Sequence, residues 1–268
     1  NSSIKIIPRD TKSNPIDTLR AAKELGNLGI KIIIGPVFNK NQAYLYGLKE
    51  ITFISLTNKG GNKSKNIINA GINATSQLNS IKKFIELNNI KKTIFLTPDV
   101  NYKEEIEKAI DNSKIKILGN YIYKTDPTKL TNQIEKITNY KRRKQNLKNE
   151  IVRLEKSNQS SKKRLIEKLK KKDTIGSVKF DSIVIADFDE GLKSITTSLL
   201  YTDISPKTKY FITLNQWFDK TLLKESSSQP LYFPSINKKN YEDFSLEYFD
   251  KFNQYPNQLS FLSFDLIG

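Results

Sequence analysis

Short apolar runs alternate with amphipathic segments from the start of the chain, and this alternation constrains the fold more than any other feature. It is the order expected of parallel strands that are joined and covered by helices, so the chain is predicted to be an α/β protein. The predicted strands are Ile4–Ile7, Ile30–Ile34, Ile51–Leu56, Thr93–Thr97, Ile115–Tyr123, Ser182–Ala186, Tyr210–Leu214 and Leu231–Pro234. The predicted helices are Ile16–Leu28, Gln42–Lys49, Thr75–Asn88, Tyr102–Asn112, Pro127–Thr138, Glu190–Leu200, Tyr241–Phe252 and Pro256–Leu266.

One basic segment interrupts this alternation. Residues 141–172 carry fourteen Lys or Arg and three acids, so they contribute +11 of the net charge of +17. Tyr140, Leu147 and Leu154 recur every seven residues, Leu165 and Leu169 continue on a second arm, and residues 157–161 are polar. This spacing predicts an inserted helical hairpin over residues 139–173. Its simplest role is a surface helix pair with a solvated basic face, and the alternative is peripheral contact with an anionic membrane or cell wall.

Composition excludes several classes of chemistry. The chain has no Cys and no His, which removes disulfides, thiolate catalysis, the usual general base and the commonest metal ligand. No phosphate-binding loop and no dinucleotide-binding motif is present. Nucleic acid is not an expected partner, because Tyr140 is the one aromatic residue near the basic run. We therefore expect a protein that is not an enzyme, with neither a cofactor nor a metal site.

Polar and aromatic residues follow several predicted strands, where ligands bind in open α/β sheets. For Thr57 and Asn58, turn formation is an equally good interpretation. For Asp187 a solvated loop acid is the simpler interpretation, and for Trp217, the one Trp, simple packing is. The candidate ligand-binding residues are Asn39, Lys40, Thr57, Asn58, Asp99, Tyr102, Asp187, Glu190 and Trp217.

The order of several short motifs is similar to that of a known family. Asp10 follows the first strand, Pro15 lies in the turn, Ala21-Ala22 lie in the helix, and Gly35-Pro36 end the next strand. These positions resemble the type I periplasmic binding fold of the Leu/Ile/Val-binding kind. Residues 54–58, residues 97–102 and the final stretch, residues 255–268, resemble further markers of that family.

The inserted segment narrows the resemblance to one branch. The basic hairpin and the motifs after it are similar to the penicillin-binding protein activator family, which includes alphaproteobacterial lipoproteins. Residues 39–46 match poorly, and Lys103 replaces the usual Gly. The family also has a strand and a long helix before the position of Asn1 and continues past Gly268, so we expect both ends to belong to a longer protein. The matching residues are Tyr140, Arg142–Lys144, Asp173–Gly176, Phe180-Asp181, Ala186–Phe188 and Leu214–Asp219.

The resemblance implies two Rossmann-like lobes with parallel sheets and a ligand cleft between them. Lobe 1 would comprise residues 1–75 and 236–268, and lobe 2 residues 76–235 with the hairpin inserted. By analogy with the family, Thr57 and Asn58 would bind a ligand carboxylate, while Glu190 or Asp187 would meet an ammonium group. Tyr102 would cover the apolar part of an amino-acid-like ligand.

The resemblance also implies a function without catalysis. We expect a cell-envelope accessory protein of the periplasm that binds a peptidoglycan synthase. The alternative is the substrate-binding protein of an ABC transporter, which would capture an amino acid or a similar small polar solute and meet a permease. Anchoring in the outer membrane is the further option that the lipoprotein members suggest.

Overall fold

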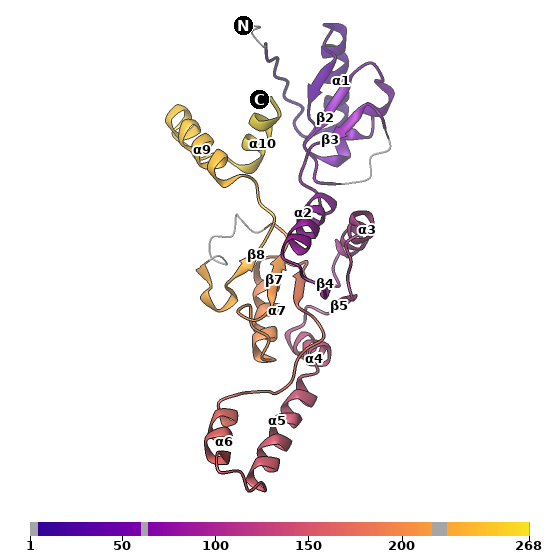
Figure 1. The fold of residues 1–268 in the computed structure, drawn as a ribbon. Coiled ribbons are helices and arrows are strands. Elements are labelled where there is room, and N and C mark those ends of the chain that lie inside the picture. The colour runs from indigo at the N-terminus through magenta and orange to yellow at the C-terminus, as the bar shows by residue number, and fades with distance from the viewer. Residues whose placement is uncertain (1–4, 60–63, 216–223, 268) are drawn as a thin grey trace. The chain divides into compact units, whose positions relative to one another are not determined.

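The chain forms two compact units, described here from a computed structural model (Figure 1). The first unit comprises residues 1–76 and 236–268, and the second comprises residues 77–235. The structure describes residues 5–59, 64–215 and 224–267. Each unit has its own parallel sheet, so the prediction of an α/β fold with two groups of parallel strands is confirmed.

The sheet of the first unit has three parallel strands in the order β1-β2-β3. They are β1 (Ile32–Ile34), β2 (Thr52–Ser55) and β3 (Ile67–Asn69). Helix α1 (Pro15–Asn27) begins where the side chain of Asn14 accepts hydrogen bonds from the N–H groups of Ile16 and Asp17, with Pro15 at its first position. One face of the helix packs on the sheet, in a core of Ala22, Leu45, Ile51, Phe53 and Ile67.

Two C-terminal helices complete the first unit. Helices α9 (Lys238–Phe252) and α10 (Gln258–Ile267) contact each other through aromatic side chains. The ring of Phe244 lies 5.5 Å from that of Phe261 and 4.8 Å from that of Phe264, measured between centroids. These contacts explain the amphipathic pattern that the sequence shows at its end.

Among the described residues, strand β1 pairs with a neighbour on one edge, that of β2. Its main chain pairs with β2 through the N–H of Gly35 and the carbonyl of Lys31, so the main-chain groups of Ile32 and Ile34 face the other side. The side chain of Ile32 is 63% exposed. Residues 5–11 run as extended chain without strand pairing. The prediction of a strand over Ile4–Ile7 is therefore wrong for the part that the structure describes.

The sheet of the second unit has five parallel strands in the order β5-β4-β6-β7-β8. Every residue of β4 (Thr93–Pro98) and β6 (Ser182–Ile185) is buried, as expected of central strands covered on both faces. Strands β5 (Gly119–Tyr123), β7 (Tyr210–Thr213) and β8 (Leu231–Tyr232) complete the sheet. The chain order reverses between β4 and β6, and doubly wound sheets bind ligands at this topological switch point.

Five helices connect or cover these strands. Four of them are α2 (Ala74–Leu87), α3 (Lys103–Ser113), α4 (Pro127–Ile137) and α7 (Asp189–Tyr201); the fifth, the hairpin helix α5, packs on α4 and not on the sheet. The main core of this unit lies between the sheet and helices α4 and α7, and includes Leu130, Ile134, Leu192, Ile195 and Leu199. Because all strands are parallel, their carboxyl ends share one edge of the sheet.

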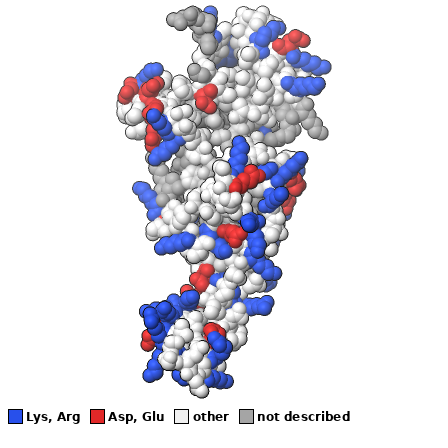
Figure 2. Space-filling model, viewed as in Figure 1, with Lys and Arg blue, Asp and Glu red and all other residues white. Residues whose placement is uncertain are grey.

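The basic insertion is a helical hairpin, as the sequence predicts. Helix α5 (Tyr140–Glu155) and helix α6 (Lys162–Lys170) flank a turn at residues 156–161. They lie side by side and extend from the second unit on the far side of α4 from the sheet (Figure 1). Leu147 and Leu154 are buried at this helix pair, while Lys and Arg side chains cover both of its flanks (Figure 2).

Two further elements differ from the sequence prediction. Residues 42–49, predicted as a helix, form parts of two 3-10 helices, Asn39–Gln42 and Leu45–Gly47. Strand β3 was not predicted, because three residues are too short to show an alternating pattern. Within the described residues, no helix is long and apolar enough to cross a membrane.

The base of the hairpin is fixed to the second unit by Arg143, which is 6% exposed. Its guanidinium donates to the carbonyl of Thr202 at 2.9 Å, to the hydroxyl of Thr174 at 2.6 Å and to the carbonyl of Gly176 at 3.3 Å. The ring of Tyr140 packs on that of Tyr201, with centroids 5.3 Å apart. One cation of the basic run therefore has a structural role, and the hairpin base is part of the fold.

Replacing Arg143 should destabilise the second unit, whereas replacing its neighbour should not. Arg143→Met leaves the buried carbonyl of Thr202, the buried hydroxyl of Thr174 and the partly buried carbonyl of Gly176 without this donor, so we expect a loss of about 2–4 kcal/mol in the free energy of unfolding. Arg142→Met removes the same charge from an exposed position and should change it by less than about 0.5 kcal/mol. Urea unfolding followed by circular dichroism measures both, and equal losses in the two variants would contradict this role of Arg143.

Candidate ligand site at the strand ends

A buried carboxylate occupies the switch point of the second unit. Asp187 lies two residues after the end of β6, and its side chain is buried. Its carboxylate accepts hydrogen bonds from the hydroxyl of Tyr102 at 3.1 Å, from the hydroxyl of Tyr123, and from the N–H of Phe188 at 2.8 Å. We call Tyr102, Tyr123 and Asp187 the switch-point cluster. It joins the carboxyl ends of β4, β5 and β6.

Helix α7 closes over this carboxylate. A Cβ atom at Gly191 would lie 2.5 Å from one Asp187 carboxylate oxygen and 2.6 Å from the other, so only glycine fits at this position without a shift. Burial, followed by the charge of Asp187, raises the pKa of the Tyr102 and Tyr123 hydroxyls far above the ordinary value. Both phenols therefore remain protonated donors to Asp187 at neutral pH.

Asp99 lies beside the cluster, just after β4. Its carboxylate pairs with Lys124 and, at 2.9 Å, with Lys103. These two hydrogen-bonded ammonium groups lower the pKa of Asp99 to about 2. Asp99 is thus neutralised by its own neighbours. The Lys103 that departs from the family pattern has a defined partner here.

The remaining candidates of the second unit are exposed or lie outside the described residues. Glu190, in the first turn of α7, is 85% exposed and pairs with Lys193 at 2.7 Å. Trp217 lies outside the described residues. The structure therefore brings Tyr102 and Asp187 into direct contact, and places Asp99 just after β4 and Glu190 in the first turn of α7.

The candidates of the first unit follow β1 and β2. Asn39 and Lys40 begin the first 3-10 helix and are exposed, as is Asn58. Thr57 is buried, and its hydroxyl accepts a hydrogen bond from the N–H of Lys59 at 3.2 Å. This is the geometry of a turn, the second of the two interpretations that the sequence left open for Thr57.

A buried polar network lies at the same strand ends and was not predicted. The amide of Gln42, which is fully buried, donates to the hydroxyl of Ser55 at 2.7 Å and to the side-chain oxygen of Asn69 at 3.1 Å. Ser55 in turn donates to the carbonyl of Pro36 at 2.8 Å. A Cβ at Gly71 would lie 2.1 Å from the carbonyl oxygen of Thr57, so the chain passes very close to this turn. The network holds the ends of β1, β2 and β3 together.

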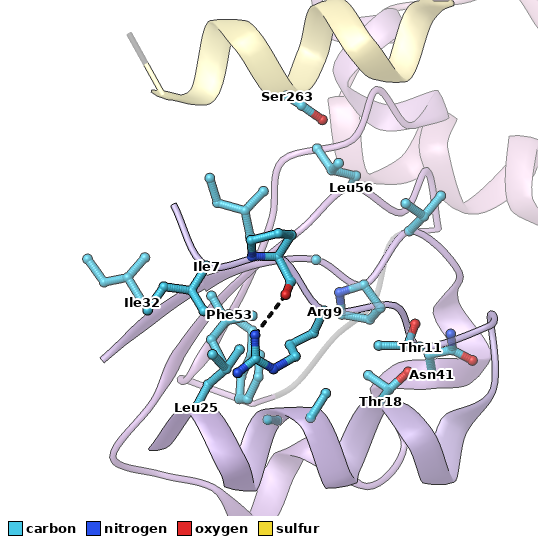
Figure 3. Close-up of a pocket in the computed structure, with 18 of the residues that line it drawn as sticks. Ile7, Arg9, Thr11, Thr18, Leu25, Ile32, Asn41, Phe53, Leu56 and Ser263 are labelled. Atoms are coloured by element: carbon cyan, nitrogen blue, oxygen red, sulfur yellow. Dashed lines mark hydrogen bonds between the residues drawn. The ribbon is translucent and has the colours of Figure 1, made fainter. Parts of the chain in front are cut away.

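An apolar pocket of about 780 Å³ lies elsewhere in the first unit (Figure 3). It is bounded by the extended residues 5–9, by β1 and by α1, with Ile7, Leu25, Ile32 and Phe53 among its lining residues. Ser263 of α10 lies at one side. None of the eight candidate residues that the structure describes lines it. The pocket follows the outer edge of β1 and reaches residues just past the carboxyl ends of β1 and β2, among them Pro36, Asn41 and Leu56.

The described residues hold no group of three or more acids that could bind a metal ion. The chemistry available at the strand ends is thus hydrogen bonding by phenols, amides and hydroxyls together with lysine–carboxylate pairs.

Solved structures with a similar fold are binding proteins. An ABC transporter substrate-binding protein from Desulfitobacterium hafniense matches with a TM-score of 0.55 and 13% identity over 98% of this chain and 70% of that chain. A branched-chain amino acid ABC transporter periplasmic ligand-binding protein from Burkholderia xenovorans LB400 matches with a TM-score of 0.58 and 12% identity, over 93% of this chain and 61% of that chain. The chain has the type I periplasmic-binding-protein fold.

Full-length LpoA from Haemophilus influenzae is similar as well, with a TM-score of 0.58 and 10% identity over 92% of this chain and 41% of LpoA. The chain therefore spans less than two thirds of two of these three proteins. No family model and no curated protein sequence matches it. At these identities the likeness establishes the fold, and the function has to be argued from the site.

Tyr123 should contribute to stability through its hydrogen bond to Asp187. Tyr123→Phe leaves a buried carboxylate short of one donor, so we expect a loss of about 1–3 kcal/mol in the free energy of unfolding. Tyr121→Phe, on the same strand, removes a hydroxyl from a side chain that is 41% exposed and serves as the control. Chemical unfolding of both variants measures the difference, and a loss no larger than that of the control would contradict the role of the cluster.

The stabilising effect of Asp99 should depend on pH. Because its pKa is lowered from 3.8 to about 2 in the folded state, the carboxylate stabilises the fold above pH 3.8, and this effect is lost as the pH falls toward 2. Asp99→Asn should therefore lower the stability at pH 6 and make little difference near pH 2. Thermal unfolding of both proteins across this range tests the sign. A difference that grows on acidification would contradict it.

Proposed function

We propose that the chain is a non-catalytic accessory protein of the cell envelope that uses the periplasmic-binding fold as a scaffold for binding another protein. The observation that carries this proposal is that the carboxylate of Asp187 already accepts hydrogen bonds from three protein donors. A receptor for amino acids needs an accessible acid to pair with the ligand ammonium. Asp187 lies at the switch point, where such an acid is expected, but it is buried and already accepts hydrogen bonds from two phenols and a backbone N–H.

The other candidate acids are also engaged by protein groups. Asp99 is paired with two lysines, and the exposed Glu190 is paired with Lys193. Breaking such pairs for a small ligand would cost part of the binding energy. The described strand ends of the second unit are thus better suited to form a rigid surface for a protein partner than to bind an ammonium group.

Catalysis has no support from the residues of this site. The chain lacks His and Cys, and the raised pKa of the Tyr102 and Tyr123 hydroxyls disfavours proton transfer by them at neutral pH. The similar structures are named as transporter binding proteins and LpoA, which also favours a binding function.

The alternative is a substrate-binding protein of an ABC transporter for amino acids or similar solutes. It is favoured by the named structural neighbours and by one residue of the site. Asp189 is exposed at the start of α7, and its negative charge contributes to the raised pKa of the Tyr102 hydroxyl, after burial and Asp187. Among the acids discussed here, it is the one placed to meet a ligand ammonium.

The periplasm is the proposed location, and a peptidoglycan synthase is the proposed partner. Both follow from the resemblance to the activator branch, which rests on the motifs around the hairpin. A clamped, protruding hairpin is consistent with a scaffold, since solute capture does not require one. Lipid anchoring at the outer membrane remains part of the proposal.

Binding measurements separate the two functions. Isothermal titration with the proteinogenic amino acids should give no saturable heat, while a purified peptidoglycan synthase from the same source should bind the immobilised chain. Saturable binding of an amino acid that is lost in Asp189→Asn, together with absence of synthase binding, would establish the receptor instead. Glu190→Gln, on the same helix turn, is the matched control for the Asp189 variant.

A further inference from the structure

The hairpin carries a high density of positive charge that the folded protein does not neutralise. Of the fourteen Lys and Arg in residues 141–172, three form ion pairs within the described part of the chain. They are Lys141 with Glu135, Arg143 with Asp203, and Arg153 with Glu150. All residues of the hairpin are described, and none of its other cations pairs with an acid; Lys144 lies over the ring of Tyr140, and Lys162 donates to main-chain oxygens. The fold concentrates this charge on two adjacent short helices.

The charge surrounds the hairpin instead of covering one face. On α6, Lys163, Arg164 and Lys168 are all exposed. At about 100° of rotation per residue, Arg164 and Lys168 lie on one side of the helix, and Lys163 lies about 100° around from Arg164. On α5 the exposed cations include Arg142, Lys144 and Lys148. Figure 2 shows basic side chains on both flanks of the hairpin. A partner that follows the hairpin can therefore meet cations from several directions.

The hairpin has little apolar surface left to insert into a membrane. Leu147 and Leu154 are buried and Ile151, Ile166 and Leu169 are half-buried, which leaves Val152 and Leu165 as separate exposed apolar side chains. Helices that lie on bilayers present a continuous apolar face opposite the basic one. A flat bilayer would also reach the cations on one side only. A flexible chain fits this distribution better than a lipid surface does.

The hairpin also lacks the groups that bind nucleobases. Proteins that hold single-stranded nucleic acids combine cations with exposed aromatic rings on which the bases stack. Tyr140 is the one aromatic residue of residues 140–173, and it is 6% exposed and packed on Tyr201. The polymer that suits this surface therefore needs repeating anionic groups and no aromatic bases.

We propose that the α5–α6 hairpin is a binding arm for a flexible, linear, non-aromatic polyanion with repeating phosphate or carboxylate groups. Its base is held in the second unit by Arg143, so the arm presents its cations at a fixed place on the protein. Binding releases the counterions that condense on the polymer and is therefore strongly salt-dependent. This inference does not rest on the proposed accessory function, and either can fail without the other.

Charge-neutral variants of the full chain test the proposal. The arm variant replaces Lys163, Arg164, Lys168 and Lys170 by Gln. The control variant replaces Lys91, Lys92, Lys116 and Lys207 by Gln, all of them exposed and in the same unit. Both variants lose the same net charge. Circular dichroism and thermal unfolding should show that both remain folded, because none of these side chains has a hydrogen bond or ion pair among the described contacts.

Long-chain inorganic polyphosphate is the probe, with an oligo(dT) strand and phosphatidylglycerol vesicles as comparisons at equal anionic-group concentration. We expect the unmodified chain and the control variant to bind polyphosphate alike, and the arm variant to bind at least about tenfold more weakly with a smaller dependence on salt. If both variants bound polyphosphate equally weakly, the binding would depend on net charge alone and not on the arm, and the proposal would be overturned. Tighter binding to vesicles or to oligo(dT) than to polyphosphate would overturn it in favour of a lipid surface or a nucleic acid.

Discussion

The buried carboxylate of Asp187 is the contact on which the architecture of the second unit depends. Parallel strands bring their carboxyl ends to one edge, where polar loop groups must find partners out of water. Asp187 meets this need for three strands at once, since Tyr102 follows β4, Tyr123 ends β5 and Asp187 itself follows β6. Because Gly191 has no side chain, the first turn of α7 can pack directly against the carboxylate of Asp187. The same hydrogen bonds that stabilise the sheet edge are the reason why we propose that Asp187 does not serve as a ligand-binding acid.

The first unit solves the same problem with neutral groups. Gln42, Ser55 and Asn69 tie its strand ends through amide and hydroxyl hydrogen bonds, and no charge has to be buried there. Its outer strand edge is less well covered. Among the described residues no strand pairs with the outer edge of β1, and the side chain of Ile32 on this strand is exposed. Parallel sheets normally have both edges protected. The apolar pocket of this unit lies beside the same edge and is bounded there by residues 5–9 (Figure 3).

Patterns that repeat over many residues were predictable from the sequence, and single contacts were not. The seven-residue spacing of Tyr140, Leu147 and Leu154, the leucines of a second arm and the polar residues 157–161 together predicted the hairpin. The rule that ligands bind at strand ends selected Asp99, Tyr102 and Asp187. The same rule would have found Tyr123, the last residue of a predicted strand. It could not find Arg143, because one buried arginine within a run of exposed cations leaves no mark in composition or periodicity. Nor could it show that Asp187 is already saturated, since the donors lie 64 and 85 residues away in the chain.

The hairpin differs from the rest of the fold because repulsion between its positive charges destabilises its helices. Lys144 and Lys148, and likewise Arg164 and Lys168, are like charges four residues apart on one helix, an arrangement that destabilises isolated helices. Helix α6 has nine residues, which is too few for stability in water without packing. The helices therefore persist through the leucines between them and through the Arg143 anchor at their base. A polyanion lying along the hairpin would relieve the repulsion at every such pair, so binding and folding of this arm favour each other.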